Sequence, residues 1–588
     1  MVGSIVLWGL MAWITWDTWV EPFVDFGREL YVPWRISEGD RLFHDIAYFN
    51  GPVSPWWNAL GFRLFGPSIQ TLTRINLFLN LVFTVLLYRF LRRWFAMAAA
   101  TGASIVFSIV FVFPHLTVNN AFNYIAPYSH EAVHSLYLSF AVLALAIRPG
   151  VFSCVGTGFC FGLVCMMKPE TGVAVAGALV LVVSLHRRDP HGPADRVRIR
   201  VLTWIVSACA AVFIASTAIS ADCELTEAVM HAMGAWRFTF RPEVSATPFY
   251  RLTSGMGDPV GNSMAMVANA VGILCLTGIG IWVSLRAGRI RTARNKWRLY
   301  LVVMASTAVT CRLVFPLITW HALPRSLPVL LVVSLVACVA LRRTFPCTPL
   351  HTSCTILLPF AGFGLLLLLK IILFARLYHY GFVLALPASI TVIIMLMQII
   401  PETLRLHHGE PRFFRDPAVI VLACLIIGHM IPAWHHHQNA FTVFESERGH
   451  LITDRRGDYL QKIVDTVEAV LDPTDTLAVL PQGVIINFLT EHRSSVRHVV
   501  FMPTELAMYG EKTIIDEFAT HSPDFIILRD RSTAEHGVEF GSGYGVDLVN
   551  WIEAHYRPVE QIFPPRIGGK FGVLLLARDR SRMPDPHN

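Results

Sequence analysis

The sequence is poor in charge, since only 15% of its 588 residues are Asp, Glu, Lys or Arg, against roughly 25% in an ordinary soluble domain. Its eleven cysteines form no CxxC pair and no Cys/His spacing typical of zinc. A Gly-rich phosphate loop is also missing, because GSGYG at 541–545 lacks the GxGxxG spacing after a strand. These shortages argue against a soluble protein, a disulfide or zinc scaffold, and a nucleotide-binding enzyme.

Apolar residues, in contrast, make up 54% of the chain and gather in runs of about 17 to 22 residues. A membrane-spanning helix needs about 20 apolar residues. The sequence therefore predicts a polytopic α-helical membrane protein with about thirteen transmembrane helices. The first run lacks a basic n-region and a cleavage site, so we expect a retained signal anchor. The runs cover residues 3–19, 72–90, 97–117, 130–147, 151–167, 171–186, 201–220, 262–285, 299–316, 324–341, 354–374, 381–399 and 417–434.

Arginine clusters occupy every second connection between these runs. The positive-inside rule makes that side cytoplasmic. The chain would then start inside and carry everything after residue 435 outside, together with the 20–71, 118–129 and 221–261 connections. We expect the bacterial inner (cytoplasmic) membrane as the location. The clusters include Arg92 and Arg93, Arg148, Arg187 and Arg188, Arg286, Arg342 and Arg343, and Arg405 and Arg412.

The region after the last apolar run has a different pattern. From residue 456 onward, segments with helical periodicity alternate with short apolar strands, which indicates a soluble α/β layer fold. We therefore divide the chain into a transmembrane domain, residues 1–434, and an extracytoplasmic α/β domain, residues 435–588. The expected strands are TLAVLP, VRHVVF, DFIILRD and FGVLLLARD, and the expected helices are GDYLQKIVDTVEAVLD, VIINFLT, EKTIIDEFATHS and VDLVNWIEAHY.

The first outer loop, residues 20–71, combines charge with many aromatic residues, which is typical of a segment lying along the membrane interface. Asp25 and Glu29 are four residues apart, so on a helix both carboxylates would share one face. A carboxylate held beside apolar surface has the raised basicity that a general base needs. The alternative is an ordinary polar helix face, salt-bridged to Arg28 or Arg35.

Further charged residues lie at the outer ends of predicted spans, where ionisable groups are costly unless they serve a binding site. A guanidinium beside phenols suits a phosphate head group. Together these residues would make the outer membrane edge basic and suited to a lipid phosphate. The alternatives are that Arg325 and Lys370 only extend to the interface, and that Lys168 and Glu170 only pair with each other. The set is Lys168, Glu170, Arg325, Lys370, Arg376, Tyr378, His379 and Tyr380.

The loop reads D-F-G-R-E, then I-S-E-G-D-R-L-F-H-D-I and N-G-P-V-S-P. This order resembles the first luminal loop of the GT-C glycosyltransferases, in particular the protein O-mannosyltransferase-like and aminoarabinose-transferase-like membrane enzymes. Thirteen spans followed by an outer domain also resemble the latter. The resemblance implies a polyprenyl-phosphate-linked sugar donor and an acidic catalytic base, which by position is Asp25. The mannosyltransferases usually have adjacent Asp and Glu, whereas here Glu29 follows four residues later.

The expected function is therefore a membrane glycosyltransferase that moves a hexosyl or pentosyl group, with inversion, to a lipid, glycan or protein acceptor at the outer face. No cofactor is required with certainty, although Asp25, Glu29, His44 and Asp45 could hold a divalent metal. No nucleic acid is expected as a partner. A transporter or lipid flippase and a non-catalytic assembly or sensor protein are the alternatives. The expected catalytic residues are Asp25 and Glu29, and the expected substrate-binding residues are Arg28, Asp45, Lys168, Glu170, Arg325, Arg376, Tyr378, His379 and Tyr380.

Overall fold

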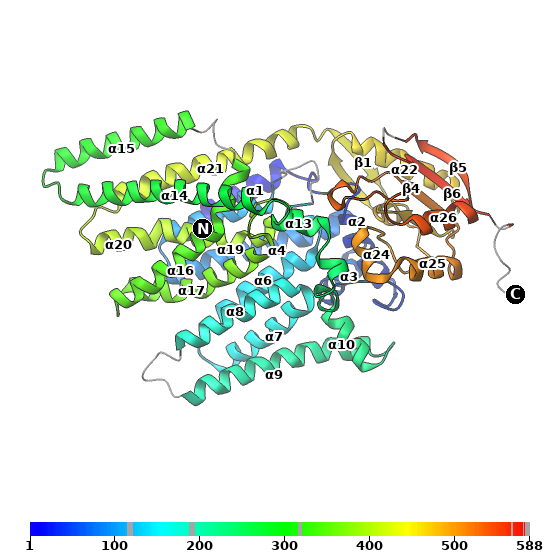
Figure 1. Ribbon diagram of the computed structural model, residues 1–588, viewed down its shortest axis with the longest axis horizontal. Coiled ribbons are helices and arrows are strands. Elements are labelled where there is room, and N and C mark those ends of the chain that lie inside the picture. Colours follow the sequence, from blue (N-terminus) through cyan, green and yellow to red (C-terminus); the bar gives the residue numbers. More distant parts are fainter. Residues whose placement is uncertain (115–120, 187–193, 315–319, 566–567, 580, 582–588) are drawn as a thin grey trace.

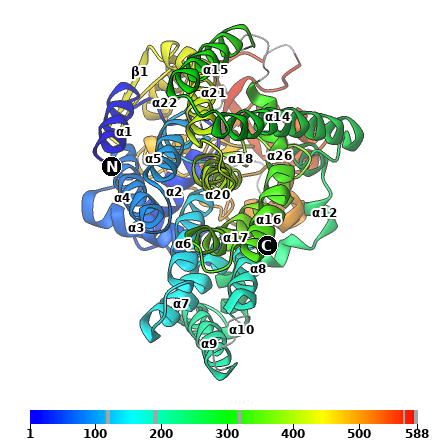
Figure 2. The same ribbon diagram turned by 90° about the vertical axis from the view of Figure 1, so that its left-hand side faces the viewer.

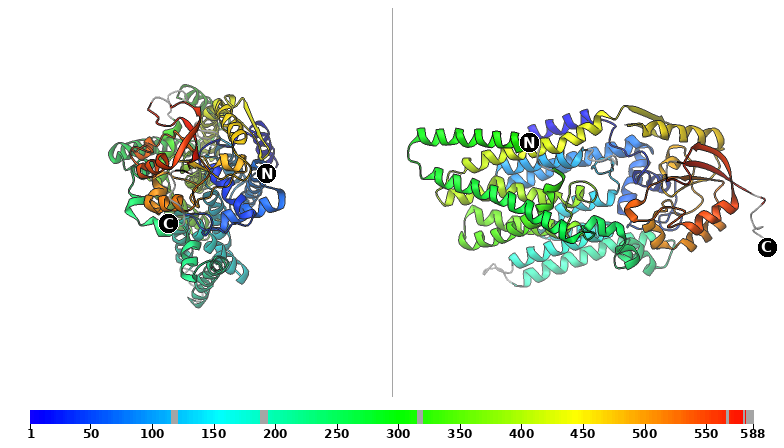
Figure 3. Two further views of the ribbon diagram at one scale, coloured as in Figure 1. Left: turned by 90° about the vertical axis from the view of Figure 1, so that its right-hand side faces the viewer. Right: turned by 45° about the horizontal axis from the view of Figure 1, so that its top comes forward.

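The computed structural model describes residues 1–114, 121–186, 194–314, 320–565, 568–579 and 581. Long helices form an elongated bundle, and a smaller unit that contains the β-sheet covers one end of it (Figure 1; Figure 3, right). This architecture confirms the predicted fold class of a helical membrane protein with a C-terminal α/β unit. Arg187, Arg188 and the start of the 118–129 connection lie outside the described residues.

The apolar runs of the sequence become helices. Among the described residues, eight helical segments are long and apolar enough to cross a membrane, and five apolar helices are shorter. Each of these thirteen segments falls on one predicted run. The long ones are Ile69–Trp94 (α4), Asp195–Ile219 (in α9, Ala194–Ile219), Pro248–Gly288 (ending in α14, Pro259–Gly288), Ala293–Val314 (α15), Ala322–Thr344 (ending in α16, Leu327–Thr344), Pro349–Ile371 (starting in α17, Pro349–Leu368), Gly381–Leu406 (including α19, Leu386–Ile394, and α20, Ile400–Leu406) and Arg412–Gln438 (α21). The shorter ones are Val2–Ile14 (α1), Met97–Val112 (starting in α5, Met97–Val106), His130–Ala146 (α6), Val151–Met167 (α7) and Pro169–Leu185 (in α8, Pro169–His186).

Arginine-rich helix ends gather at the end of the bundle that faces away from the sheet. The turn between α14 and α15 lies there in Figure 1, and Figure 2 looks onto this end. Arg286 lies in the last turn of α14, and Arg342 and Arg343 lie in the last turn of α16. The two ends of the bundle therefore differ in character, with the basic turns at one end and the sheet-containing unit at the other.

The predicted loop at residues 20–71 contains two helices, Phe26–Ser37 (α2) and Val53–Phe65 (α3). All residues of α2 from Phe26 to Ile36 are buried, because the helix lies between the bundle and the C-terminal unit. Gly27 allows the closest approach, since a Cβ atom there would lie 2.4 Å from the backbone nitrogen of Ile485. Ile485 begins a short helix of the C-terminal unit, Ile485–Leu489 (α23). The loop thus lies between the helical bundle and the C-terminal unit.

The connection between α9 and α14 also contacts the C-terminal unit. It forms four short helices, Leu225–Met233 (α10), Trp236–Thr239 (α11), Pro242–Ser245 (α12) and Pro248–Ser254 (α13). Helix α12 packs on Pro503–Tyr509 (α24), and α13 packs on the 3₁₀ turn Ala534–His536 (η6). Two connections that are distant in sequence therefore meet the same C-terminal unit.

The C-terminal unit contains a four-stranded sheet in the order β3-β4-β6-β5. Strands Leu477–Leu480 (β3) and Phe525–Arg529 (β4) are parallel, whereas Val573–Arg578 (β6) runs antiparallel to β4 and to Tyr556–Phe563 (β5). Helices Arg456–Val470 (α22), Glu511–Thr520 (α25) and Val546–His555 (α26) accompany it. A hairpin of Thr442–Ser446 (β1) and Gly449–Thr453 (β2) joins α21 to this unit. The predicted α/β pattern is thus present.

The strand predicted at VRHVVF is wrong. Residues 496–501 form no strand, because their backbone groups pair outside a sheet ladder. The Arg497 carbonyl accepts from the Ala47 N–H at 3.0 Å, and the Phe501 N–H donates to the Pro481 carbonyl at 2.8 Å. The apolar side chains of this segment pack as a buried loop instead. Strand β5 and the β1-β2 hairpin were not predicted, because YRPVEQIF contains a proline and two charged residues and the hairpin segments are short and mixed.

Candidate active site

Asp25 is the central residue of a tight turn between α1 and α2. The Phe26 N–H donates to the Val24 carbonyl at 2.7 Å, and Asp25 has φ 61° and ψ −52°. This is a γ-turn with positive φ, a rare and strained conformation that persists where the surroundings enforce it, often at functional sites. Helix α2 begins only at Phe26, so Asp25 and Glu29 do not share a helix face as predicted.

Glu21, which the sequence analysis did not single out, supports this turn. Its carboxylate accepts from the Phe23 N–H at 2.7 Å and from the Val24 N–H. The other oxygen pairs with Arg456 of the C-terminal unit at 2.6 Å. A buried carboxylate thus ties the strained turn to α22.

The Asp25 carboxyl is half-buried and accepts one hydrogen bond, from Gln482 Nε2 to Oδ1 at 3.2 Å. Burial raises the pKa of Asp25 to about 6, although the positive charges of Arg28 and Arg531 lower it. A carboxyl with a pKa near neutrality has the right strength to accept a proton in a reaction. Asp25 therefore has the properties of a general base.

Glu29 has a different environment. Its Oε1 pairs with Arg28 Nη2 at 2.9 Å, and its Oε2 accepts from His130 Nδ1 at 2.7 Å and from the His130 N–H at 3.1 Å. Burial would raise the pKa of Glu29, but Arg28 and His130 lower it below the usual range. The salt-bridged alternative thus describes Glu29 and not Asp25. With its oxygens occupied and its pKa low, Glu29 is suited to a structural role.

Polar residues at the start of α6 lie next to Glu29. His130 and Glu131 begin α6, with His130 Nε2 2.8 Å from Asn76 Nδ2 and Glu131 bonded to the Tyr48 hydroxyl. Ser129 also donates to Glu131, at 2.8 Å. The sequence analysis missed these residues, although the polar triplet Ser-His-Glu at the start of an apolar run was a usable signal.

Three residues of the predicted basic edge form a second group. Lys168 Nζ donates to Asn50 Oδ1 at 3.3 Å. Glu170 pairs with Lys370 at 2.7 Å, and Lys370 lies 4.2 Å from the ring centre of Tyr380. The alternative that Lys168 and Glu170 only pair with each other is therefore wrong, because Glu170 has a partner from a distant helix end.

The guanidinium groups of Arg325 and Arg376 both lie close to the ring of Phe374. Their guanidinium carbons lie 4.5 and 4.7 Å from the ring centre of Phe374, and Arg376 also lies 5.3 Å from that of Tyr378. Within the described part of the chain, neither arginine has a carboxylate ion-pair partner, and the buried Nε of Arg376 has no hydrogen-bond partner. Two adjacent guanidiniums without a counter-charge are suited to bind an anion such as a phosphate. His379 contacts Tyr380, and its buried Nδ1 has no hydrogen-bond partner among the residues that the structure describes.

Asp45 is not brought to this site. It pairs with Arg41 at 3.3 Å and with His44 at 2.6 Å, and Arg41 bridges to Asp222 at 2.6 Å. These side chains are partly exposed, and in the described part of the structure no hydrogen bond or ion pair links them to Asp25. The predicted metal ligands are thus dispersed, and over the described ranges no three His, Cys, Asp or Glu side chains are grouped in a way that could hold a metal ion.

The C-terminal unit contributes residues that the sequence analysis did not consider. Gln482 and Arg531 act on Asp25, and Glu505 lies in the first turn of α24. Burial raises the pKa of Glu505 to about 7, Arg28 lowers it and the charge of Asp25 raises it. Among the described residues, Glu505 has no ion-pair partner. The Asp25 site is therefore lined from both halves of the chain.

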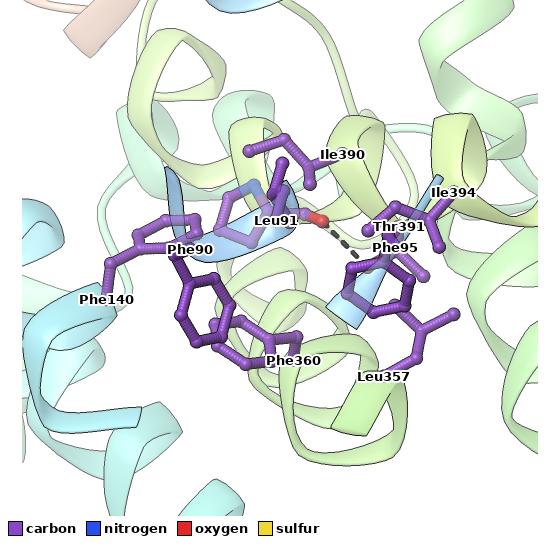
Figure 4. A pocket seen from close by; sticks show the side chains of 10 residues that line it. Phe90, Leu91, Phe95, Phe140, Leu357, Phe360, Ile390, Thr391 and Ile394 are labelled. Carbon is purple, nitrogen blue, oxygen red and sulfur yellow. Dashed lines mark hydrogen bonds between the residues drawn. The ribbon is translucent and has the colours of Figure 1, made fainter. Parts of the chain in front are cut away.

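An enclosed apolar pocket lies elsewhere in the bundle (Figure 4). It is near the end of α4 that carries Arg92 and Arg93, between α4, α17 and α19. Its one hydroxyl, that of Thr391, donates to the Pro387 carbonyl at 2.9 Å. With no ionisable lining residue, this pocket is a packing gap and carries no chemistry. Its lining is Phe90, Leu91, Phe95, Phe140, Leu357, Phe360, Pro387, Ile390, Thr391 and Ile394.

Part of the chain is similar in sequence to a known family, and the whole chain is similar in fold to solved structures. Residues 50–219 match the family model of dolichyl-phosphate-mannose-protein mannosyltransferase. Among curated proteins, none matches the sequence significantly. The oligosaccharyltransferase of Archaeoglobus fulgidus, solved in complex with Zn and sulfate, aligns over 99% of this chain and 74% of its own, with 11% identity and a TM-score of 0.50.

Two further solved structures are similar over almost all of this chain. ArnT from Cupriavidus metallidurans, bound to undecaprenyl phosphate, aligns over 99% of each chain with 13% identity and a TM-score of 0.45. The archaeal oligosaccharyltransferase AglB from Archaeoglobus fulgidus, in complex with an inhibitory peptide and a dolichol-phosphate, covers 99% of this chain and 75% of its own, with 10% identity and a TM-score of 0.47. The chain therefore contains a segment similar to the dolichyl-phosphate-mannose-protein mannosyltransferase family, and it shares the fold of the Archaeoglobus oligosaccharyltransferase.

Proposed function

We propose that this protein transfers a sugar from a polyprenyl-phosphate-linked donor to an acceptor hydroxyl, with Asp25 as the general base. The observation that carries the proposal is the Asp25 carboxyl itself, held in a strained turn with a pKa of about 6. The matched family, whose name specifies a dolichyl-phosphate-linked sugar, supports a lipid-phosphate donor. No nucleotide is required, in keeping with the missing phosphate loop.

The donor phosphate is placed at Arg325 and Arg376 in this proposal. Their guanidiniums, which have no carboxylate partner among the described residues, lie beside Phe374. They are at connections next to long apolar helices, where an isoprenoid chain can pack. Fixed cations stabilise the negative charge that develops on the leaving phosphate.

The reaction follows from these positions. The acceptor oxygen attacks the anomeric carbon, Asp25 takes the hydroxyl proton, and the bond between that carbon and the phosphate oxygen breaks. The polyprenyl phosphate leaves with the electron pair. A single displacement from the side opposite the phosphate inverts the anomeric configuration. Residues 1–434 would form the catalytic membrane domain, and residues 435–588 would lie outside the cytoplasm.

Loss of the Arg376 guanidinium tests the phosphate site. Arg376→Ala should weaken the binding of a radiolabelled polyprenyl phosphate about tenfold to a hundredfold, because charge-assisted hydrogen bonds contribute roughly 1.5–3 kcal/mol each. Arg286→Ala is the matched control, since Arg286 also lies over an aromatic ring, Trp282, but at the opposite end of the bundle. An unchanged affinity in Arg376→Ala would exclude the phosphate role.

The identity of the donor can be tested on the purified protein. Mass spectrometry of copurified lipid is expected to detect a polyprenyl phosphate, with or without an attached sugar, in the wild type. The amount should fall in the double variant Arg325→Ala/Arg376→Ala. If only membrane phospholipids are recovered from both proteins, the proposed donor class is contradicted.

A further inference from the structure

A single glutamine connects the C-terminal unit to the Asp25 carboxyl. Gln482 follows β3 by two residues, and its amide Nε2 donates to Asp25 Oδ1 at 3.2 Å. Arg531 Nε donates to the Gln482 side-chain Oε1 at 3.3 Å, and Arg529 Nη1 donates to its backbone carbonyl at 3.1 Å. Gln482 is 4% exposed. Both the position and the side chain of this residue are thus fixed by Arg529, the last residue of β4, and by Arg531 just after it.

We propose that Gln482, held by Arg531, is a positioning residue that fixes the Asp25 carboxyl for proton transfer. The inference rests on the proposed function in one respect, namely that Asp25 is the base. It assigns the C-terminal unit a part in the reaction, because the base of the membrane part would then work only with an amide supplied from the other half of the chain.

The orientation of the amide follows from the chemistry of its neighbours. A glutamine amide has one acceptor oxygen and one NH₂ donor group, whereas a guanidinium can only donate. Arg531 must therefore take the Gln482 oxygen, and this leaves the NH₂ group for Asp25. Arg531 is itself held by the Ser532 carbonyl at 2.6 Å and by Glu535 at 3.6 Å. The donor is thus preset toward the carboxylate before any substrate binds.

Gln482 acts on Asp25 in a way that the surrounding charges do not. The charged groups that face Asp25 are Arg28, Arg531, Glu21, Glu29 and Glu505. Over the residues the structure describes, however, the side-chain hydrogen bond to the carboxyl comes from Gln482 alone. An N–H donor stabilises the ionised carboxylate and restricts its rotation. Removal of this donor should raise the pKa of Asp25 and free the carboxyl to turn.

The test is a pH titration of Asp25 by infrared difference spectroscopy on the full-length protein in lipid nanodiscs. The Asp25 band is identified by its absence in Asp25→Asn. In the wild type we expect titration near pH 6. In Gln482→Met, which keeps the length of the side chain, the midpoint should rise by about one to two pH units, because a hydrogen bond to a charged group has that strength.

Gln461→Met is the matched control. Gln461 belongs to the same unit and also donates its amide to a carboxylate, Asp465 at 2.8 Å, but this pair is exposed. Its Asp25 titration should equal that of the wild type. Gln482→Glu, which exchanges the donor for a second carboxylate, should raise the midpoint at least as far as Gln482→Met and still fold.

The outcomes separate the two proposals. If Gln482→Met and Gln482→Glu titrate at the wild-type pH, Gln482 does not position Asp25, and the inference is overturned while the base assignment stands. If Asp25→Asn keeps full sugar transfer, the base assignment fails whatever the titrations show. A raised midpoint together with a reduced kcat and an unchanged affinity for polyprenyl phosphate would support the positioning role.

Discussion

Asp25→Asn is expected to reduce sugar transfer by at least about a hundredfold, and by up to about ten thousandfold, which is the usual contribution of a general base. Asparagine keeps the size of the side chain and can still accept the hydrogen bond from Gln482, but it cannot take a proton. The loss should therefore be in kcat, with the affinity for polyprenyl phosphate unchanged. Transfer of radiolabelled sugar from a polyprenyl-phosphate donor measures this effect, and undiminished turnover would disprove the base assignment.

The same residue predicts a pH dependence. Burial raises the pKa of Asp25 to about 6, so the carboxyl is mostly protonated below that pH and cannot act as a base. Transfer by the wild type should increase as the pH rises through about 6 and then level off. The residual activity of Asp25→Asn should lack this step. A wild-type profile that is flat between pH 5 and 8 would show that another group accepts the proton.

Much of the membrane part could be predicted from the sequence, because each helix needs only local information. An apolar run of sufficient length predicts a helix wherever it lies, and all thirteen runs coincide with apolar helices. The strands at TLAVLP and DFIILRD were predictable for a similar reason. VRHVVF has the composition of a strand as well, but whether a segment joins a sheet depends on a free neighbouring edge, and its backbone instead pairs with Ala47 and Pro481.

The site was predictable only in part, since its contacts join residues that are far apart in the chain. The charge pattern of the first loop and the resemblance to GT-C enzymes pointed to Asp25. The turn that holds it depends on Glu21 and on Arg456, 435 positions away. The amide of Gln482 is 457 positions from Asp25. A single sequence contains no periodic signal for such pairs.

The sequence analysis named both Asp25 and Glu29 as catalytic, with Asp25 as the base, and the structure separates them by their partners. Glu29 neutralises Arg28 and holds His130, both of which are buried. Asp25 has no such ion-pair partner among the described residues. A carboxylate that satisfies two buried groups contributes to stability, whereas one with a raised pKa and a single hydrogen bond is available for chemistry.

Glu29→Ala is therefore expected to destabilise the protein by about 3–5 kcal/mol, because it leaves the buried Arg28 guanidinium without its counter-charge and the buried His130 ring without its hydrogen-bond partner. The free energy of unfolding can be measured by denaturant titration in detergent micelles. Asp516→Ala is the matched control: Asp516 pairs with Lys512 at 3.0 Å on the exposed face of α25, where an ion pair contributes little. If Glu29→Ala is as stable as Asp516→Ala but loses sugar transfer, Glu29 takes part in the reaction and the structural assignment is wrong. If it is destabilised, and Glu29→Gln regains part of the stability together with transfer, its role is to hold Arg28 and His130 behind the base.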